Sequence, residues 1–219
     1  MSQQISVNHA AGPLSVALAS ERRLVLSQKK DWGEILTGFE AANRYEILTE
    51  SGQPLGRVSE VSNGIWATLG RWMFKGRRPF TLVIESGGQE TLRLRRPWFW
   101  FFSTLLVEDG GGRAIGRIEQ RFAFFQRNFD IVDAGGAQVA RIVGPMFRPW
   151  TFEVRAGDQE VARIEKRWSG LLKEMFTDAD NFSLTLPQSG DPQLSSLILA
   201  AALLIDFCYF ENTDANRSS

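Results

Sequence analysis

The sequence predicts a mainly β protein in which a closed 12-stranded antiparallel barrel surrounds a buried hydrophobic C-terminal helix. Three observations predict this fold class. A hairpin pattern repeats along most of the chain, and one long segment near the C-terminus is apolar on every side. In addition, 43% of the 219 residues are hydrophobic, which is enough for a sizeable core.

The repeated pattern occurs five times. Each copy has an alternating strand, a Gly-rich turn, and a second strand that usually carries a small residue, Arg and a β-branched residue. Glycine in the turn permits positive φ, and the period-two alternation places apolar residues on one face of each strand. Each copy therefore predicts a β-hairpin. The copies are residues 45–58, 80–94, 104–118, 129–142 and 152–164.

One further strand is expected at each end of this repeat, at residues 24–26 and 182–186. With the five hairpins they make twelve strands. A meander of this length has to curl, and closure into a barrel removes the unpaired backbone groups of its edge strands. A barrel near this strand number is wide enough to surround a helix.

Residues 192–210 form the segment suited to fill the barrel. Asp191 and Pro192 are typical of a helix start, because Asp accepts bonds from the first free N–H groups and Pro fits the first turn. Since the helix is also long enough to cross a bilayer, a membrane-spanning helix is the alternative. Asp206 and the acidic flanks favour a protein core, because an Asp in lipid costs about 2.5–3.5 kcal/mol. The residues expected at the buried centre are Leu197, Ile198, Ala201, Leu204, Ile205 and Cys208.

The chain is expected to form one domain with two tails. Residues 1–20 lack the features of a signal peptide and are expected to be disordered, residues 21–212 form the barrel domain, and residues 213–219 form a disordered tail. Apolar residues at helical spacing from Trp168 to Phe176 predict a short amphipathic helix that packs on the barrel. Another short helix is expected over residues 31–39.

Enzyme chemistry finds little support in the sequence. His9 is the sole histidine and lies in the expected tail, so neither a histidine-based triad nor a multi-histidine metal site can be built. Cys208 is the single cysteine, which excludes an internal disulfide. The 25 basic and 25 acidic residues balance, so no global field attracts nucleic acid or membranes, and any such role needs a local patch. We therefore expect neither an enzyme nor a nucleic-acid partner.

Five segments of the chain match one known family in the family's own order. They are residues 36–40, 43–47 and 78–82 in the N-terminal part, and residues 166–182 and 203–211 near the C-terminus. These segments resemble the N-terminal core and the C-terminal signature of the phospholipid scramblase family, and the resemblance covers residues 24–212. It implies a tubby-like fold, which is a closed 12-stranded barrel around a C-terminal helix.

The resemblance implies a membrane-associated protein that lets phospholipids cross between leaflets. The implied partner is an anionic phospholipid membrane surface, and the expected location is cytoplasmic, peripherally at the inner face of the plasma membrane. However, a barrel plugged by its own helix offers no evident lipid path. The alternative is therefore a non-catalytic module of tubby-like type that binds anionic lipid, phosphoinositide headgroups or a protein without scrambling.

The resemblance also implies a Ca²⁺ loop, and Asp178, Asp180 and Asn181 are its candidate ligands. A loop of EF-hand type needs side-chain oxygens at positions 1, 3, 5 and 12, with Gly at position 6. Positions 1 and 3 comply, but Ser183 stands in place of the Gly and Ser189 in place of the acid at position 12. These departures weaken the expectation of calcium and favour two Asp side chains that bond a turn.

Membrane contact is expected at a basic and aromatic segment, residues 95–102, where family members often carry cysteines for palmitoylation. Trp is well suited to the headgroup boundary, and between Trp66 and Trp100 seven basic residues face two acidic ones. The alternative is that the aromatic residues fill one end of the barrel while the Arg residues are solvated. The residues expected to contact lipid are Arg77, Arg78, Arg95, Arg96, Trp98 and Trp100.

Overall fold

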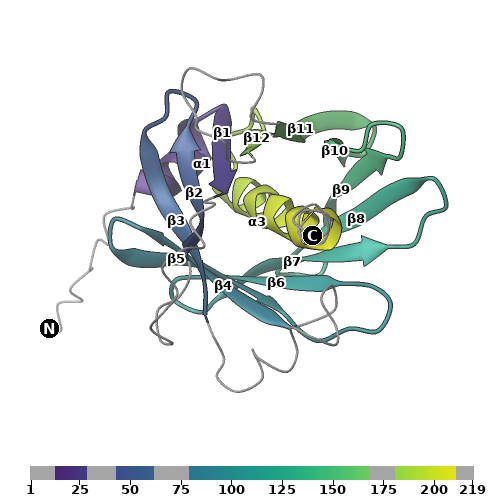
Figure 1. The fold of residues 1–219 in the computed structure, drawn as a ribbon, viewed down its shortest axis with the longest axis horizontal. Coiled ribbons are helices and arrows are strands. Elements are labelled where there is room, and N and C mark those ends of the chain that lie inside the picture. Colours follow the sequence, from purple (N-terminus) through teal and green to yellow (C-terminus); the bar gives the residue numbers. More distant parts are fainter. Residues whose placement is uncertain (1–12, 29–42, 62–78, 168–180, 211–219) are drawn as a thin grey trace, which may run out of the picture.

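Twelve antiparallel strands close into a barrel around one helix in the computed structural model, which describes residues 13–28, 43–61, 79–167 and 181–210 (Figure 1). Each strand pairs with its neighbours in the sequence, and β1 pairs with β12 to close the ring. The predicted fold class is thus confirmed. The strands are β1 (Arg23–Gln28), β2 (Asn43–Thr49), β3 (Pro54–Glu60), β4 (Phe80–Ser86), β5 (Gln89–Arg96), β6 (Thr104–Asp109), β7 (Ala114–Arg121), β8 (Gln126–Asp133), β9 (Gln138–Pro145), β10 (Thr151–Ala156), β11 (Gln159–Arg167) and β12 (Asn181–Thr185).

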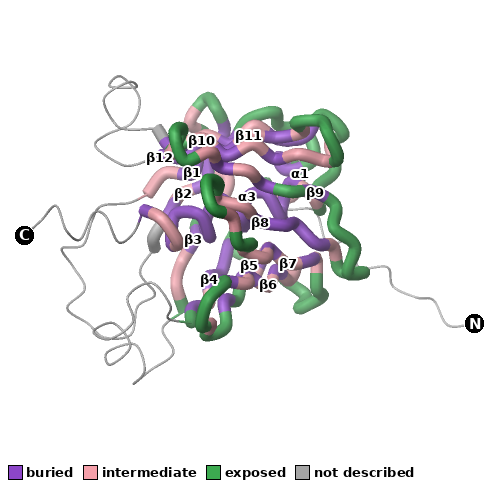
Figure 2. The backbone as a smooth tube through the Cα atoms, turned by 90° about the vertical axis from the view of Figure 1, so that its right-hand side faces the viewer, coloured by how far each residue is buried: buried purple, intermediate pink, exposed green. Residues whose placement is uncertain are grey.

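The five predicted hairpins correspond to β2–β3, β4–β5, β6–β7, β8–β9 and β10–β11. Glycine is needed in their turns because the backbone there adopts positive φ, for example 61° at Gly87 and 88° at Gly136. Alternate residues of the strands are buried, and the exposed segments lie mainly at the connections between strands (Figure 2). The period-two pattern in the sequence therefore predicts correctly which strand residues face the inside of the barrel and which face outward.

The apolar helix α3 (Pro192–Tyr209) lies inside the barrel (Figure 1). Asp191 caps it as predicted, since its Oδ1 accepts bonds from the N–H groups of Gln193 at 2.9 Å and Leu194 at 3.2 Å. By length and composition α3 could cross a membrane, but 72% of it is buried within the protein. Five of the six residues expected at its centre are at most 1% exposed, namely Leu197, Ile198, Ala201, Leu204 and Ile205. Cys208, the sixth, is only partly buried.

The small residues of the repeat point into the barrel, and one of them lies against α3. Gly116, Ala140 and Ala162 point inward, each directly before an arginine that points outward. A Cβ added at Gly116 would lie 2.3 Å from the Val132 carbonyl oxygen and 3.1 Å from Cδ2 of Leu197 on α3. At Gly116 the small residue is therefore required both by the neighbouring strand and by α3.

Asp206 is neutralised inside the barrel by residues from distant strands. Its Oδ2 accepts a hydrogen bond from the Tyr45 hydroxyl, and its Oδ1 lies 3.5 Å from Nζ of Lys166. The side chains of Asp206 and Lys166 are each 1% exposed. A charged residue in an apolar helix is thus accommodated because the closed barrel brings its partners to it.

Helix α1 (Pro13–Ser20) corrects the expected disordered tail over residues 13–20. Leu14, Ala17 and Leu18 are buried, and the Leu14 N–H donates to Ser86 Oγ at 3.0 Å. The helix packs against α3 and β3. Eight residues are too few to form a stable helix alone, so the contacts with the barrel decide this segment. Residues 1–12 and 213–219, and the helices predicted at 31–39 and 168–176, lie outside the described residues.

Candidate functional site

Three connections between strands gather at one end of the barrel. Because neighbouring strands run in opposite directions, the β5–β6, β7–β8 and β9–β10 connections, residues 97–103, 122–125 and 146–150, emerge on the same side. The C-terminal end of α3 lies there too, since Gln120 Nε2 at the end of β7 donates to the Tyr209 hydroxyl at 3.2 Å. We call these three loops the aromatic end.

The aromatic end exposes an unusual amount of apolar surface. Phe101 and Phe147 are each 83% exposed, and Phe125 is 80% exposed. The three loops contain no Asp or Glu, and Arg148 is their one cation. A contiguous apolar surface of this kind marks contact with a membrane or a protein. The other exposed apolar residues of these loops are Trp98, Trp100, Phe102, Phe122, Phe124, Met146 and Trp150.

The opposite end of the barrel has the reverse character. Its turns are short, rich in glycine, and carry Asp109, Asp133 and Asp158. Asp109 orders its own turn, because its Oδ1 accepts bonds from the N–H groups of Gly111 and Arg113, both at 2.9 Å. The three described loops of the aromatic end and the turns of the opposite end therefore differ in hydrophobicity and in charge.

The residues predicted to contact lipid lie in different places in the structure. Trp98 and Trp100 are 42% and 66% exposed at the aromatic end, so lipid contact by them stays a prediction. Arg95 lies on the outer wall and pairs with Glu108 at 2.7 Å. Arg77 and Arg78 lie outside the described residues.

Arg96 is a correction to the predicted lipid contacts. It is 2% exposed, and its guanidinium lies 4.3 Å from the ring centroid of Phe80 and 6.0 Å from that of Phe207 on α3. Successive residues of a strand point to opposite faces, so Arg95 points outward and Arg96 into the barrel. The prediction that Arg96 contacts lipid is therefore wrong.

Sequence reasoning missed the other two loops of the aromatic end. Residues 122–125 read Phe-Ala-Phe-Phe, and residues 146–150 read Met-Phe-Arg-Pro-Trp. Both runs connect successive hairpins of the repeat, as residues 97–103 do. Their shared position in the repeat was the available signal, because every connection between hairpins reaches the same end of an antiparallel barrel.

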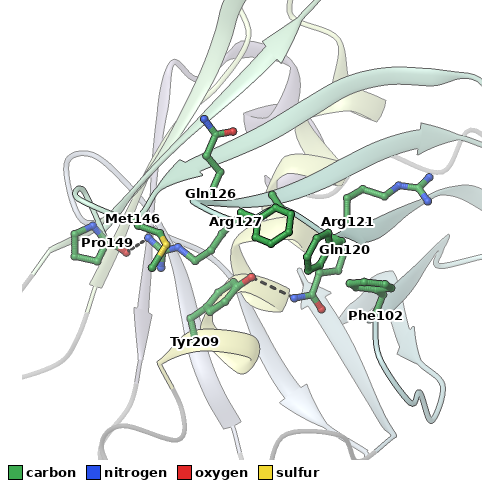
Figure 3. Close-up of a pocket in the computed structure, with 11 residues that line it drawn as sticks. Phe102, Gln120, Arg121, Gln126, Arg127, Met146, Pro149 and Tyr209 are labelled. Carbon is green, nitrogen blue, oxygen red and sulfur yellow. Dashed lines mark hydrogen bonds between the residues drawn. The ribbon is translucent and has the colours of Figure 1, made fainter.

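An open pocket of about 510 Å³ lies among the aromatic loops (Figure 3). Arg127 reaches into it and donates from Nη2 to the Pro149 carbonyl oxygen at 2.7 Å. Tyr209, at the C-terminal end of α3, also lines the pocket, and burial raises the pKa of its hydroxyl. The pocket therefore contains a guanidinium group beside exposed apolar side chains.

The arginines of the outer wall are mostly neutralised by carboxylates. Asp130 accepts from Nε of Arg121 at 2.7 Å and from Nε of Arg141 at 2.8 Å. The hydrogen bond to Asp130 raises the pKa of Arg121, and the bond to Glu160 raises the pKa of Arg163. These arginines of the wall are thus paired with carboxylates, although Asp130 is shared by two of them.

The candidate calcium ligands are only partly described. Asp178 and Asp180 lie outside the described residues, whereas Asn181 begins β12 and is 5% exposed. Among the described residues no donor bonds its Oδ1, which is an oxygen of the kind that calcium prefers. Within the described part of the chain, however, no three His, Cys, Asp or Glu residues cluster, so those residues alone do not make a calcium site.

The fold is shared with a solved structure. The X-ray structure of a protein from Arabidopsis thaliana superimposes with a TM-score of 0.51. The match covers 90% of this chain and 99% of that protein, at 14% sequence identity. At this identity the likeness concerns the fold alone.

Sequence comparison identifies the family. Phospholipid scramblase 1 of Mus musculus is 31% identical over 211 residues, and that of Homo sapiens is 31% identical over 210 residues. A phospholipid scramblase family protein of Schizosaccharomyces pombe is 28% identical over 211 residues. These matches cover 90%, 89% and 90% of this chain, which spans 63%, 65% and 54% of the relatives' own lengths. The family model Scramblase matches residues 1–212, and this chain therefore belongs to the Scramblase family.

Proposed function

We propose that this protein docks on anionic phospholipid membranes through the aromatic end and takes part in the transbilayer movement of phospholipids. The observation that carries the proposal is the exposure of aromatic residues on three loops at one end of the barrel. Family membership and the names of the relatives support phospholipid as the partner. The proposed activity moves lipids without making or breaking covalent bonds.

The composition of the loops suits a bilayer surface. Moving Trp and Phe rings out of water lowers the free energy of the system, by about 1.5–3 kcal/mol for a fully buried Phe. Trp98 and Trp100 pack edge to face, with ring centroids 4.4 Å apart, and are suited to the headgroup boundary. Because these three loops contain no acidic residue, they do not themselves repel anionic lipid.

Docking in this orientation points the C-terminal end of α3 toward the bilayer and the acidic turns away from it. The barrel then stays outside the hydrocarbon region, as a peripheral protein. We propose that the membrane face is the cytoplasmic face of the plasma membrane.

A second candidate function is an anionic-lipid, phosphoinositide or protein-binding module of tubby-like type that does not scramble. The filled interior of the barrel favours it, because Leu203, Leu204 and Ile205 of α3 are all 0% exposed. With the interior occupied, no lipid can pass through the barrel. Scrambling would therefore have to proceed along the outside of the protein, at the membrane that the loops contact.

Co-sedimentation with vesicles containing anionic phospholipid tests the docking step. Replacing Phe101 and Phe147 with Ser removes two rings that are each 83% exposed, so folding should be unaffected. We expect binding to weaken at least about a hundredfold, given roughly 1.5 kcal/mol or more for each of the two inserted rings. The matched control is Val16→Ser, which removes an exposed apolar side chain at the opposite end. Equal binding by all three proteins would contradict docking through the aromatic end.

Proteoliposomes that contain a labelled phospholipid separate the two functions. Accelerated movement of the label between leaflets by the wild type, lost in the Phe101→Ser, Phe147→Ser variant, supports scrambling. Vesicle binding with an unchanged rate of movement supports the binding module.

A further inference from the structure

The pocket at the aromatic end contains a cation that the described residues do not neutralise. Arg127 is half-buried in β8, and its guanidinium lies 4.5 Å from the ring centroid of Phe152 and 5.0 Å from that of Tyr209. One of its five N–H donors goes to the Pro149 carbonyl oxygen. In the part of the chain that the structure describes, no carboxylate pairs with it.

Arg127 differs in this respect from the arginines of the barrel wall, which pair with carboxylates. Carboxylates raise the pKa of Arg93, Arg121 and Arg163, whereas burial lowers the pKa of Arg127. A guanidinium stays charged in proteins, so the fold keeps a partly desolvated positive charge at this place. Among the described residues, only the Pro149 carbonyl oxygen accepts a hydrogen bond from Arg127, and a guanidinium can bind a carboxylate or a phosphate through two of its other donors.

The surroundings of Arg127 restrict the anion to an amphiphile. The pocket is open, and although Gln120, Arg121 and Gln126 also line it, its most exposed groups are apolar. Phe122, Phe124 and Met146 are 66%, 79% and 59% exposed. The rings of Phe122 and Phe124 are in edge-to-face contact, with centroids 4.9 Å apart. A free inorganic anion would use the guanidinium and leave these apolar groups in water. A phospholipid would satisfy both, with its phosphate on Arg127 and its acyl chains along the rim.

We propose that this pocket is a phospholipid subsite in which Arg127 binds the phosphodiester group of one membrane lipid while the aromatic loops contact its acyl chains. The inference rests on the proposed docking of the same loops and adds the group that recognises the lipid. Since the phosphodiester is common to glycerophospholipids, the site selects phospholipids over neutral lipids. It does not select one headgroup over another.

Calorimetric titration with soluble lipid tests the subsite without requiring a membrane. The probe is dihexanoylphosphatidylcholine below its micelle-forming concentration, compared with glycerophosphocholine, inorganic phosphate and octanoate. We expect the short-chain lipid to bind and Arg127→Gln to weaken its binding about tenfold or more, as for loss of a charge-assisted bond. The other three probes should bind more weakly than the lipid, because each lacks either the acyl chains or the phosphodiester.

A second pair of variants leaves Arg127 and its ring contacts intact. Met146→Glu places a carboxylate on the rim, where it competes for the guanidinium and repels phosphate, whereas Met146→Gln has nearly the same shape without the charge. We expect the Glu variant to weaken binding of the short-chain lipid and the Gln variant to bind like the wild type. This pair decides the question if Arg127→Gln does not fold.

Several results would overturn the subsite. They are no binding of the short-chain lipid by the wild type, equal affinity in wild type, Arg127→Gln and Met146→Glu, or binding of inorganic phosphate or octanoate as tight as that of the lipid. Vesicle docking that persists alongside any of these results leaves the docking proposal standing. Conversely, short-chain lipid binding by a protein that does not dock on vesicles would refute docking alone.

Discussion

Replacing Ala201 with Leu tests whether α3 fills a protein core or belongs in lipid. Ala201 lies in the middle of α3 and is 0% exposed, as are its neighbours Ala200 and Ala202. Leu and Ala have similar helix propensities, so the substitution changes packing far more than helix formation. The added carbons have no free space inside a close-packed barrel.

The two environments predict opposite effects. Overpacking a filled core costs about 1–3 kcal/mol. For a protein of this size, each kcal/mol lowers the melting temperature by about 2–4 °C, so we expect a decrease of about 2–12 °C. In a bilayer, by contrast, Leu near a helix centre is favourable by about 0.3–0.6 kcal/mol.

Thermal unfolding followed by circular dichroism, without detergent, measures this difference. The matched control is Ala19→Leu, because Ala19 lies on α1 and is exposed. Its effect should stay within about 0.5 kcal/mol, as for most surface substitutions. If Ala201→Leu melted at or above the wild-type temperature while the control behaved as expected, the reasoning that α3 fills a close-packed core would be refuted.

Two further predictions concern the barrel wall. Gly116→Ala should lower the melting temperature, because its Cβ would lie 2.3 Å from the Val132 carbonyl oxygen, whereas Gly135→Ala should not, since the nearest atom is 3.4 Å away. Glu160→Gln should destabilise the protein at neutral pH by less than about 1 kcal/mol in urea titrations, because the Glu160 and Arg163 side chains are partly exposed. The bond from Arg163 holds the pKa of Glu160 below its ordinary value of 4.5, so this stability is present above pH 4.5 and lost as the pH falls through the lowered pKa. A difference between wild type and Glu160→Gln that persisted well below that pH would contradict the assignment.

The alternation of apolar and polar residues is a local property, and it predicted the hairpins from sequence. In β7, Gly116 and Ile118 point inward and Arg117 outward, as the period-two pattern requires. The start of α3 was also predictable, because Asp191 caps it through bonds to residues two and three positions ahead. Both features depend only on near neighbours.

The candidate site was only partly predictable. Trp98 and Trp100 were found because their composition is unusual within one segment. Phe124 and Phe147 were missed because each run is short, and only the antiparallel path of the chain places it beside the first segment. Arg96 was assigned to the surface because its charge was considered without its position in β5.

By itself, the sequence determined the strand repeat, the helix and its start, because each follows from the spacing of residues close together in the chain. Only the tertiary structure decided what surrounds that helix and which loops share a surface. Tyr45 reaches Asp206 across 161 residues, and this bond exists because the closed barrel brings β2 to α3. The aromatic end likewise arises from closure, since antiparallel pairing sends every second connection to the same side of the barrel.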